Sequence, residues 1–415
     1  MQGCKQKLSL FILAGIFNAG FGQQILDFNF LFLADSLKAN QVFYLQSGYS
    51  VESNAISNSL LEEAYFEGTI SDKTKEKGVD KFRENSLFSV NYSTSFLYRN
   101  RLKKKLTLLA GFYDRYDLYS SFKGDLLKLA LEGNDHPDFR GKAVDFGNFN
   151  LLAFHQQALS IGLEKQFNDS LFIGGTLSII KSGSLRKIEA NDLFLFTEQS
   201  GERIDYRADY NGKIADDTTR SQLASFEGFG TAINLHAAYH CNNKWLFGFQ
   251  IQDLGFISYP NAQQTDTLVE GSESGIDVGN PFSSDNVFNL NDEYPNPDDF
   301  KREKKAYTLL LPAKFSLTTI YKIDPNWRLL SALNYQIIKG YIPQVILTPS
   351  YVKNNYSIRL YNKFGGFTQY DLGLQFQKTW NNKYGVMLHF LQLERLFLSE
   401  TSTGQALQVG IFARF

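Results

Sequence analysis

Apolar and polar residues alternate along the last stretch of the chain, residues 405–415. The apolar positions recur at every second residue: Leu407, Val409, Ile411, Ala413 and Phe415. The alternate positions carry Gln408, Gly410 and Arg414, with Phe412 as the apolar exception. A period of two is that of a β-strand with one apolar face. Taken alone, this stretch fits a membrane barrel and the edge strand of a soluble sheet equally well.

The same alternation recurs in paired runs along most of the chain. The predicted hairpins pair residues 87–100 with 106–119, 158–167 with 170–182, 230–241 with 245–256, 313–323 with 327–338, 343–353 with 356–364, and 370–380 with 384–396. Residues 41–51 read as a further strand, and residues 52–85 as a loop or short helix. Asn or Asp stands at most of the tips, as at Asn168, Asn354 and Asn381, and both residues tolerate the left-handed backbone of tight hairpin turns.

Connection length also alternates. The tight turns are separated by longer connections after Tyr119, Gly183, Tyr259 and Leu396. Short periplasmic turns opposite long extracellular loops are the asymmetry of outer-membrane barrels, and aromatic residues near the turns fit an interfacial girdle. The pattern therefore predicts an all-β fold, a single antiparallel transmembrane β-barrel over residues 41–415. We expect about 14 strands, with 12 to 16 left open by the uncertainty of strand boundaries.

Composition agrees with a barrel. Aromatic residues make up 15% of the chain, and the mean hydropathy of −0.26 is too polar for a bundle of transmembrane helices. The formal net charge is −1, without the basic stripe that a nucleic-acid partner requires.

The amino terminus reads as an export signal. Lys5 and Lys7 precede the apolar run 8–17, and small residues follow, so residues 1–22 are predicted to be a signal peptide. The run is shorter than the roughly 18–20 residues that span a membrane. Cys4 leaves with the signal, and Cys241 then remains alone, so no intrachain disulfide forms. Residues 23–40 are either a first strand or a plug inside the barrel.

Residues 126–184 resemble a family of uncharacterised Bacteroidota outer-membrane proteins that is catalogued as a domain of unknown function. A leucine-rich turn ends in Gly133-Asn134, a hairpin of the family's form spans residues 158–174, and Lys181 precedes Gly183. The aromatic carboxyl terminus, Phe415, similarly resembles the closing strand that barrel-assembly machinery reads. The resemblance implies the wider fatty-acid-transporter-like group, with about 14 strands and an amino-terminal plug, and no activity. The chain departs from the family in lacking an Asn-Pro-Ala element, where Ala34-Asp35-Ser36 stands instead.

The candidates for chemistry are weak. His236 and His240 lie on a predicted strand, about 13 Å apart, too far to share one metal ion. Ser160, His155 and Glu164 are close in sequence, yet polar side chains are obligatory in any barrel lumen, so nothing marks them as a catalytic set. We predict no catalytic, metal or cofactor-binding residue and no cofactor, and the ligand-binding residues are unknown.

Three other segments are candidates for interaction. Residues 259–305 are the most acidic connection, predicted to be a solvated loop that caps the pore or contacts a hydrophobic ligand or a protein partner. Residues 126–134 read as a short helix with Gly133 as its C-cap, either closing the barrel mouth or dipping into the outer leaflet. Residues 103–105, all lysine, form a solvated turn with a possible role at anionic lipid head groups.

The leading functional hypothesis is an outer-membrane barrel, not an enzyme, that binds or passes a hydrophobic small molecule. The alternative is a scaffold for the secretion or attachment of surface proteins, and an outer-membrane hydrolase comes third. The expected partners are outer-membrane lipid and the assembly machinery at Phe415, with no nucleic acid.

Overall fold

The computed structural model describes residues 39–64, 68–79, 83–216, 224–274, 302–393 and 403–415. The predicted signal, residues 1–22, and the predicted amino-terminal segment, residues 23–40, therefore lie outside the described residues, except for Ala39 and Asn40. None of the described helices is long and apolar enough to cross a membrane.

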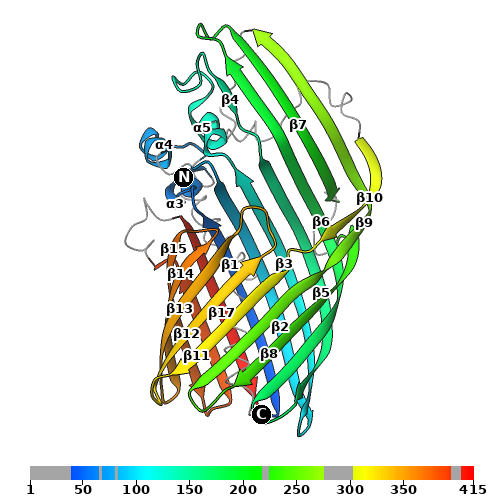
Figure 1. The fold of residues 1–415 in the computed structure, drawn as a ribbon, viewed down its shortest axis with the longest axis vertical. Coiled ribbons are helices and arrows are strands. Elements are labelled where there is room, and N and C mark those ends of the chain that lie inside the picture. The colour runs from blue at the N-terminus through cyan, green and yellow to red at the C-terminus, as the bar shows by residue number, and fades with distance from the viewer. Residues whose placement is uncertain (1–38, 65–67, 80–82, 217–223, 275–301, 394–402) are drawn as a thin grey trace, which may run out of the picture.

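A ring of 14 antiparallel strands closes on itself (Figure 1). In ring order the strands are β1 (Gln41–Ser53), β2 (Ser86–Lys103), β3 (Leu106–Phe122), β5 (Phe149–Gln166), β6 (Leu171–Thr197), β8 (Gly228–His240), β9 (Trp245–Ser274), β11 (Lys314–Lys322), β12 (Trp327–Gln336), β13 (Ile342–Lys353), β14 (Tyr356–Gly366), β15 (Tyr370–Trp380), β16 (Tyr384–Leu391) and β17 (Gly404–Arg414). β17 pairs with β1 from Val42↔Arg414 to Glu52↔Gly404, which closes the ring. The predicted barrel, its strand number and its closing strand are confirmed.

The ring has polar residues inside and apolar residues outside. On β17, Gln408 is 6% exposed, whereas Ile411 is 48% exposed. On β13, Thr348 is buried and its neighbour Leu347 is exposed. A soluble barrel would bury its apolar face. This inverted polarity is the pattern of a barrel that lies in lipid.

The two ends of the ring differ. At the end where Phe415 lies, which we name the turn end, adjacent strands are joined by the predicted tight turns, and Asn354, Asn381 and Asn382 there have positive φ angles of 51–55°. The opposite end, the loop end, carries the helices α3 (Asn58–Glu62), α4 (Asp72–Val79) and α5 (Gly124–Glu132). The predicted helix over residues 126–134 is confirmed as α5, with Gly133 after it at φ 79°. Its Leu131 packs with Ile56 and Leu60.

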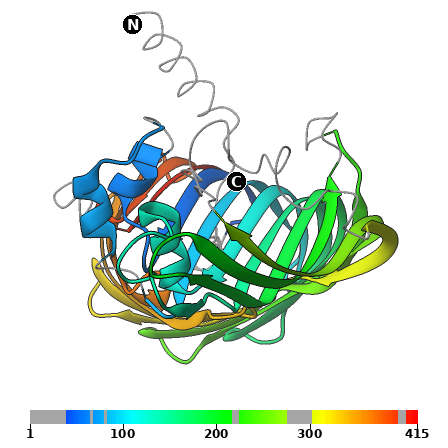
Figure 2. The same ribbon diagram turned by 90° about the horizontal axis from the view of Figure 1, so that it is seen from above.

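A second part of the sheet rises beyond the ring at the loop end, and we name it the extension. β4 (Ala143–Asp145), β7 (Arg203–Asp216) and β10 (Arg302–Leu310) pair there with the far halves of β6 and β9. Seen from above, the extension (green to yellow) stands on a different side of the ring from the helices α3 and α4 (blue) (Figure 2).

The extension corrects two predictions. The prediction of a long connection after Gly183 is wrong, because β6 continues to Thr197. The prediction of a loop over residues 259–305 is wrong at both ends, because β9 continues to Ser274 and β10 begins at Arg302. Residues 275–301 lie outside the described residues. Both faces of these strands carry polar side chains, so the alternation that predicts a half-apolar strand is missing there.

Candidate functional site

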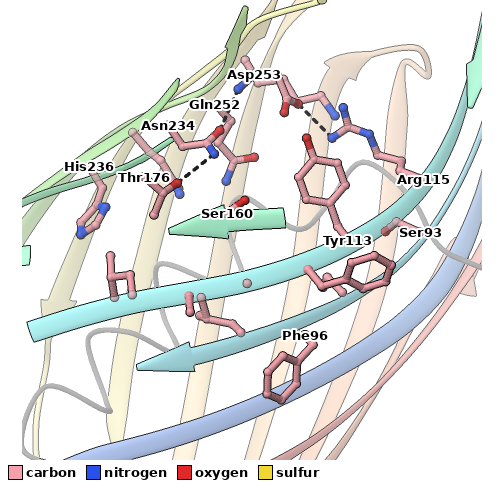
Figure 3. Close-up of a pocket in the computed structure, with 18 residues that line it drawn as sticks. Ser93, Phe96, Tyr113, Arg115, Ser160, Thr176, Asn234, His236, Gln252 and Asp253 are labelled. Carbon is pink, nitrogen blue, oxygen red and sulfur yellow. Dashed lines mark hydrogen bonds and ion pairs between the residues drawn. The ribbon is translucent and has the colours of Figure 1, made fainter. Parts of the chain in front are cut away.

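A cavity of about 160 Å³ lies in the barrel lumen, and we name it the lumenal chamber (Figure 3). It is lined by residues of β2, β3, β5, β6, β8, β9 and the start of β11, among them the apolar residues Phe96, Leu97, Leu109 and Phe112. Its polar lining comprises Ser93, Ser95, Tyr113, Arg115, Ser160, Thr176, Asn234, His236, Gln250, Gln252, Asp253 and Lys314. Most of these residues occupy the polar positions of strands in which polar and apolar residues alternate. Because successive side chains of a strand point to opposite faces, these polar side chains point into the lumen.

Arg115 is the centre of a buried charge network on one side of the chamber. Its Nε lies 2.6 Å from Asp117 Oδ2, and its Nη1 lies 2.9 Å from Asp253 Oδ2. Tyr119 donates a hydrogen bond to Asp117 at 2.9 Å, and Gln336 donates to the Tyr119 hydroxyl at 3.0 Å. These contacts join β3 to β9 and, across the lumen, to β12. Removal of one member of such a network would leave a buried charge without its partner.

A bulge in β9 brings Asp253 into this network. The pairing of β8 with β9 shifts between Ile233 and Leu235, so that Asn234 faces an extra residue on β9. Asp253 there has a φ angle of 57°. Its backbone N–H donates to Asn234 Oδ1 at 2.9 Å, and Asn234 Nδ2 donates to Thr176 at 3.1 Å (Figure 3). Bulges and left-handed non-glycine residues are frequent at functional sites, where they redirect a side chain.

Next to this bulge, the strand that pairs with β9 changes from β10 to β11. Its ladder with β10 ends at Phe256↔Leu310, and its ladder with β11 begins at Gln252↔Lys314. Between them the chain passes through Pro312, which has no N–H to donate to a ladder. This change of neighbour places Lys314 at the edge of the chamber.

Lys314 is buried, with 4% of its surface exposed. Among the residues that the structure describes, its ammonium has neither a hydrogen-bond acceptor nor an ion-pair partner. Three more buried polar atoms of the chamber lining lack a partner there, namely Ser93 Oγ, Tyr113 Oη and Gln250 Oε1. Because most buried polar atoms in proteins are hydrogen-bonded, these groups make the chamber a candidate binding site.

A second charge cluster lies beside the chamber. Arg99 Nη2 is 2.7 Å from Glu164 Oε1, and His236 Nε2 is 3.0 Å from Glu164 Oε2. The Glu164 carboxylate thus has a partner at each oxygen.

The structure separates the residues that the sequence had offered for catalysis. Ser160 pairs with Ser178 at 2.7 Å, His155 Nε2 lies 3.0 Å from Asp114, and Glu164 belongs to the Arg99 cluster. No two of these three residues contact each other in the described contacts. No group of metal-ligating side chains occurs in the described part of the chain.

A larger cavity, of about 340 Å³, lies at the loop end, and we name it the mouth cavity. Apolar residues from β10, the β10–β11 connection and the β12–β13 connection, including Leu309, Pro312 and Ile338, line it together with Lys187 and Glu189. Tyr119 and Leu309 also belong to a buried apolar cluster that includes Phe154, Tyr259 and Phe367, and Tyr113 of the chamber packs against the same cluster. The cluster thus lies between the two cavities.

The family model described as "Family of unknown function (DUF5723)" matches residues 37–388. The chain belongs to this family. The predicted membership of a domain family of unknown function is confirmed, whereas the affiliation with Bacteroidota stays a prediction. No curated protein matches the chain.

Among solved structures, the chain is similar to the Pseudomonas putida toluene transporter TodX, with 10% identity, 92% of each chain covered and a TM-score of 0.44. It is similar to the Ralstonia pickettii toluene transporter TbuX, with 10% identity, 91% and 90% covered and a TM-score of 0.43. It is also similar to a Pseudomonas aeruginosa FadL homologue, with 9% identity, 91% and 90% covered and a TM-score of 0.45. At these values, the fold assignment rests on the strand pairing of the chain itself.

Proposed function

We propose that this protein is an outer-membrane barrel that binds a small molecule and passes it through its lumen, from the loop end towards the turn end. The observation that carries the proposal is the pair of cavities, one at the mouth and one in the lumen, each lined by both apolar and polar groups. The inverted polarity of the wall supports a location in lipid. Short turns are periplasmic in such barrels, so the loop end would face the exterior.

The mouth cavity would collect the molecule. Leu309, Pro312 and Ile338 offer an apolar surface, and Lys187 and Glu189 at its edge offer polar contacts. A molecule that is hydrophobic over part of its surface fits this lining, since pockets for such ligands combine apolar walls with a few polar groups.

The Arg115 network would control passage. The bond from Gln336 to Tyr119, together with that from Tyr119 to Asp117, spans the lumen between β12 and β3. A solute that moves from the mouth cavity to the turn end must displace this connection or pass beside it. Selectivity in barrels arises from such lumen contacts.

Single-channel conductance in planar bilayers tests the proposal. We expect low conductance from the mature protein and larger or more frequent steps from Gln336→Ala, which removes the connection across the lumen. Gln369→Ala is the matched control, because Gln369 is exposed at the loop end, and it should behave as the unmodified protein. Deletion of residues 23–40 tests the predicted plug in the same recordings, and we expect it to raise conductance.

The absence of conductance steps from all four proteins would contradict a lumenal route. The alternative, a scaffold for surface-protein secretion or attachment, is favoured by one observation, the extension beyond the ring. A photo-reactive residue in place of Arg203, near the tip of the extension, tests it in cells. A single discrete adduct would support the scaffold, and its absence would count against it.

A further inference from the structure

The starting point is the buried ammonium group of Lys314. Two carboxylates of the chamber region, Asp117 and Asp253, lie within ion-pair distance of Arg115, at 2.6 and 2.9 Å. No carboxylate of the described residues pairs with Lys314, whose electrostatic interactions are with the Arg115 guanidinium, which repels it, and with Asp117, Asp253 and Glu52 at longer range. A buried cation without a partner is costly, and an anion brought by a ligand would remove that cost.

The other unsatisfied atoms lie around the same cavity. Ser93 Oγ and Tyr113 Oη can donate hydrogen bonds, and Gln250 Oε1 can accept one. The ring of Tyr113 carries the Arg115 guanidinium at 5.4 Å from its centre. Besides the Arg115–Asp253 ion pair, a ligand here would meet one unpaired cation, two unpartnered hydroxyls and one unpartnered amide oxygen, together with the apolar side chains of the lining.

The size of the chamber limits the ligand. Its volume of about 160 Å³ is close to the roughly 150 Å³ of an engineered protein cavity that binds benzene. A long alkyl chain does not fit in such a space, whereas a single ring or a short branched chain does.

We propose that the lumenal chamber binds a small organic monocarboxylate, no larger than about the size of benzoate, with its carboxylate on Lys314. The inference rests on the proposed function and deepens it by naming the class of molecule that the lumen takes. A neutral hydrocarbon would leave the ammonium and both hydroxyls unsatisfied. A phosphate dianion would place a second negative charge close to Asp117 and Asp253, with no second unpaired cation in the described lining.

Calorimetric titration of the mature protein in detergent with sodium benzoate tests the proposal. We expect benzoate to bind, and Lys314→Met to weaken binding by about 10- to 100-fold, the loss expected for hydrogen bonds to a charged group. Lys322→Met is the matched control, because Lys322 lies at the other end of the same strand, outside the chamber, and it should bind as the unmodified protein does.

Two further probes separate charge from shape. Benzamide, a neutral molecule of the same size, should bind at least about 10-fold more weakly than benzoate, and inorganic phosphate should bind more weakly still. Tyr113→Phe keeps the ring and removes the hydroxyl, and we expect a loss of a few-fold. Heat-dependent mobility in gels establishes that each variant is a folded barrel before titration.

Equal binding of benzoate to Lys314→Met and to the unmodified protein would overturn the proposal, as would equal binding of benzamide or of phosphate. No binding of benzoate at millimolar concentration would also overturn it. These outcomes are independent of conductance. Conductance without benzoate binding would support the proposed function and contradict the benzoate site. Benzoate binding without conductance would support the site and contradict the route through the lumen.

Discussion

Two buried lysines of this barrel have opposite surroundings. Lys363 on β14 is 1% exposed, and its Nζ lies 3.1 Å from both Glu52 of β1 and Asp371 of β15. Lys314 on β11 is 4% exposed and has no such partner among the described residues. Burial alone therefore does not distinguish a structural charge from a binding charge. The difference is whether the protein itself supplies the counter-charge, as it does for Lys363, or a ligand must supply it, as we propose for Lys314.

The largest expected effect is at Lys363. Lys363→Met leaves Glu52 and Asp371 buried without a cation, and we expect it to lower the free energy of unfolding by about 3–5 kcal/mol. Denaturant unfolding of the detergent-solubilised barrel, followed by tryptophan fluorescence, measures it. A loss below about 1 kcal/mol would contradict the comparison, since Lys363 would then contribute no more to stability than Lys314 does.

Removing the whole Lys363 cluster should cost less than removing its cation. We expect Glu52→Gln, Lys363→Met and Asp371→Asn together to restore stability to within about 2 kcal/mol of the unmodified protein, because a fully neutral replacement leaves no unpaired charge. The same unfolding measurement compares the triple and single variants. A triple variant less stable than Lys363→Met would show that the ion pairs contribute more than their burial costs.

Benzoate should stabilise the barrel through Lys314. At ten times its dissociation constant, a ligand that binds only the folded protein adds about 1.4 kcal/mol to the free energy of unfolding. We expect this gain in the unmodified protein and in Lys322→Met, and at most about 0.4 kcal/mol in Lys314→Met at the same benzoate concentration. A gain of the same size in Lys314→Met would place benzoate elsewhere on the barrel.

The smallest effect is that of Lys314→Met without ligand. Because no described partner loses its counter-charge, we expect the free energy of unfolding to change by less than about 1 kcal/mol, or to rise. Measuring Lys314→Met and Lys363→Met side by side sharpens the comparison. A loss of 3 kcal/mol or more at Lys314 would reveal a structural role.

Much of the ring is predictable from sequence, because strand period and turn chemistry are local properties. The alternation of Gln408 with Leu407 and Val409, and the turn residues Asn354 and Asn381, predict strands and turns that the structure confirms. The extension is not predictable in this way, because β9 beyond Tyr259 carries Gln263, Gln264, Thr265 and Asp266 on successive positions of both faces. The signal peptide, the plug and the partners stay predictions.

The candidate site depends on contacts that sequence does not reveal. Lys363 and Glu52 are 311 positions apart in the chain, so only the closed ring brings them together. The bulge that brings Asp253 to Arg115 arises from a register shift between β8 and β9, and no turn-forming residue in the sequence predicts it. Lys314 carries a weak signal, a charged residue at an inward position between Ala313 and Phe315, but every barrel has inward polar residues.

The most direct test of the account is single-channel recording of Gln336→Ala with sodium benzoate, beside the same variant carrying Lys314→Met or Lys322→Met. If the chamber lies on the route, benzoate should reduce the conductance of Gln336→Ala and of its Lys322→Met form. It should leave the Lys314→Met form unchanged. Conductance steps that benzoate reduces equally in all three forms would contradict the site, and no conductance in any form would contradict the route.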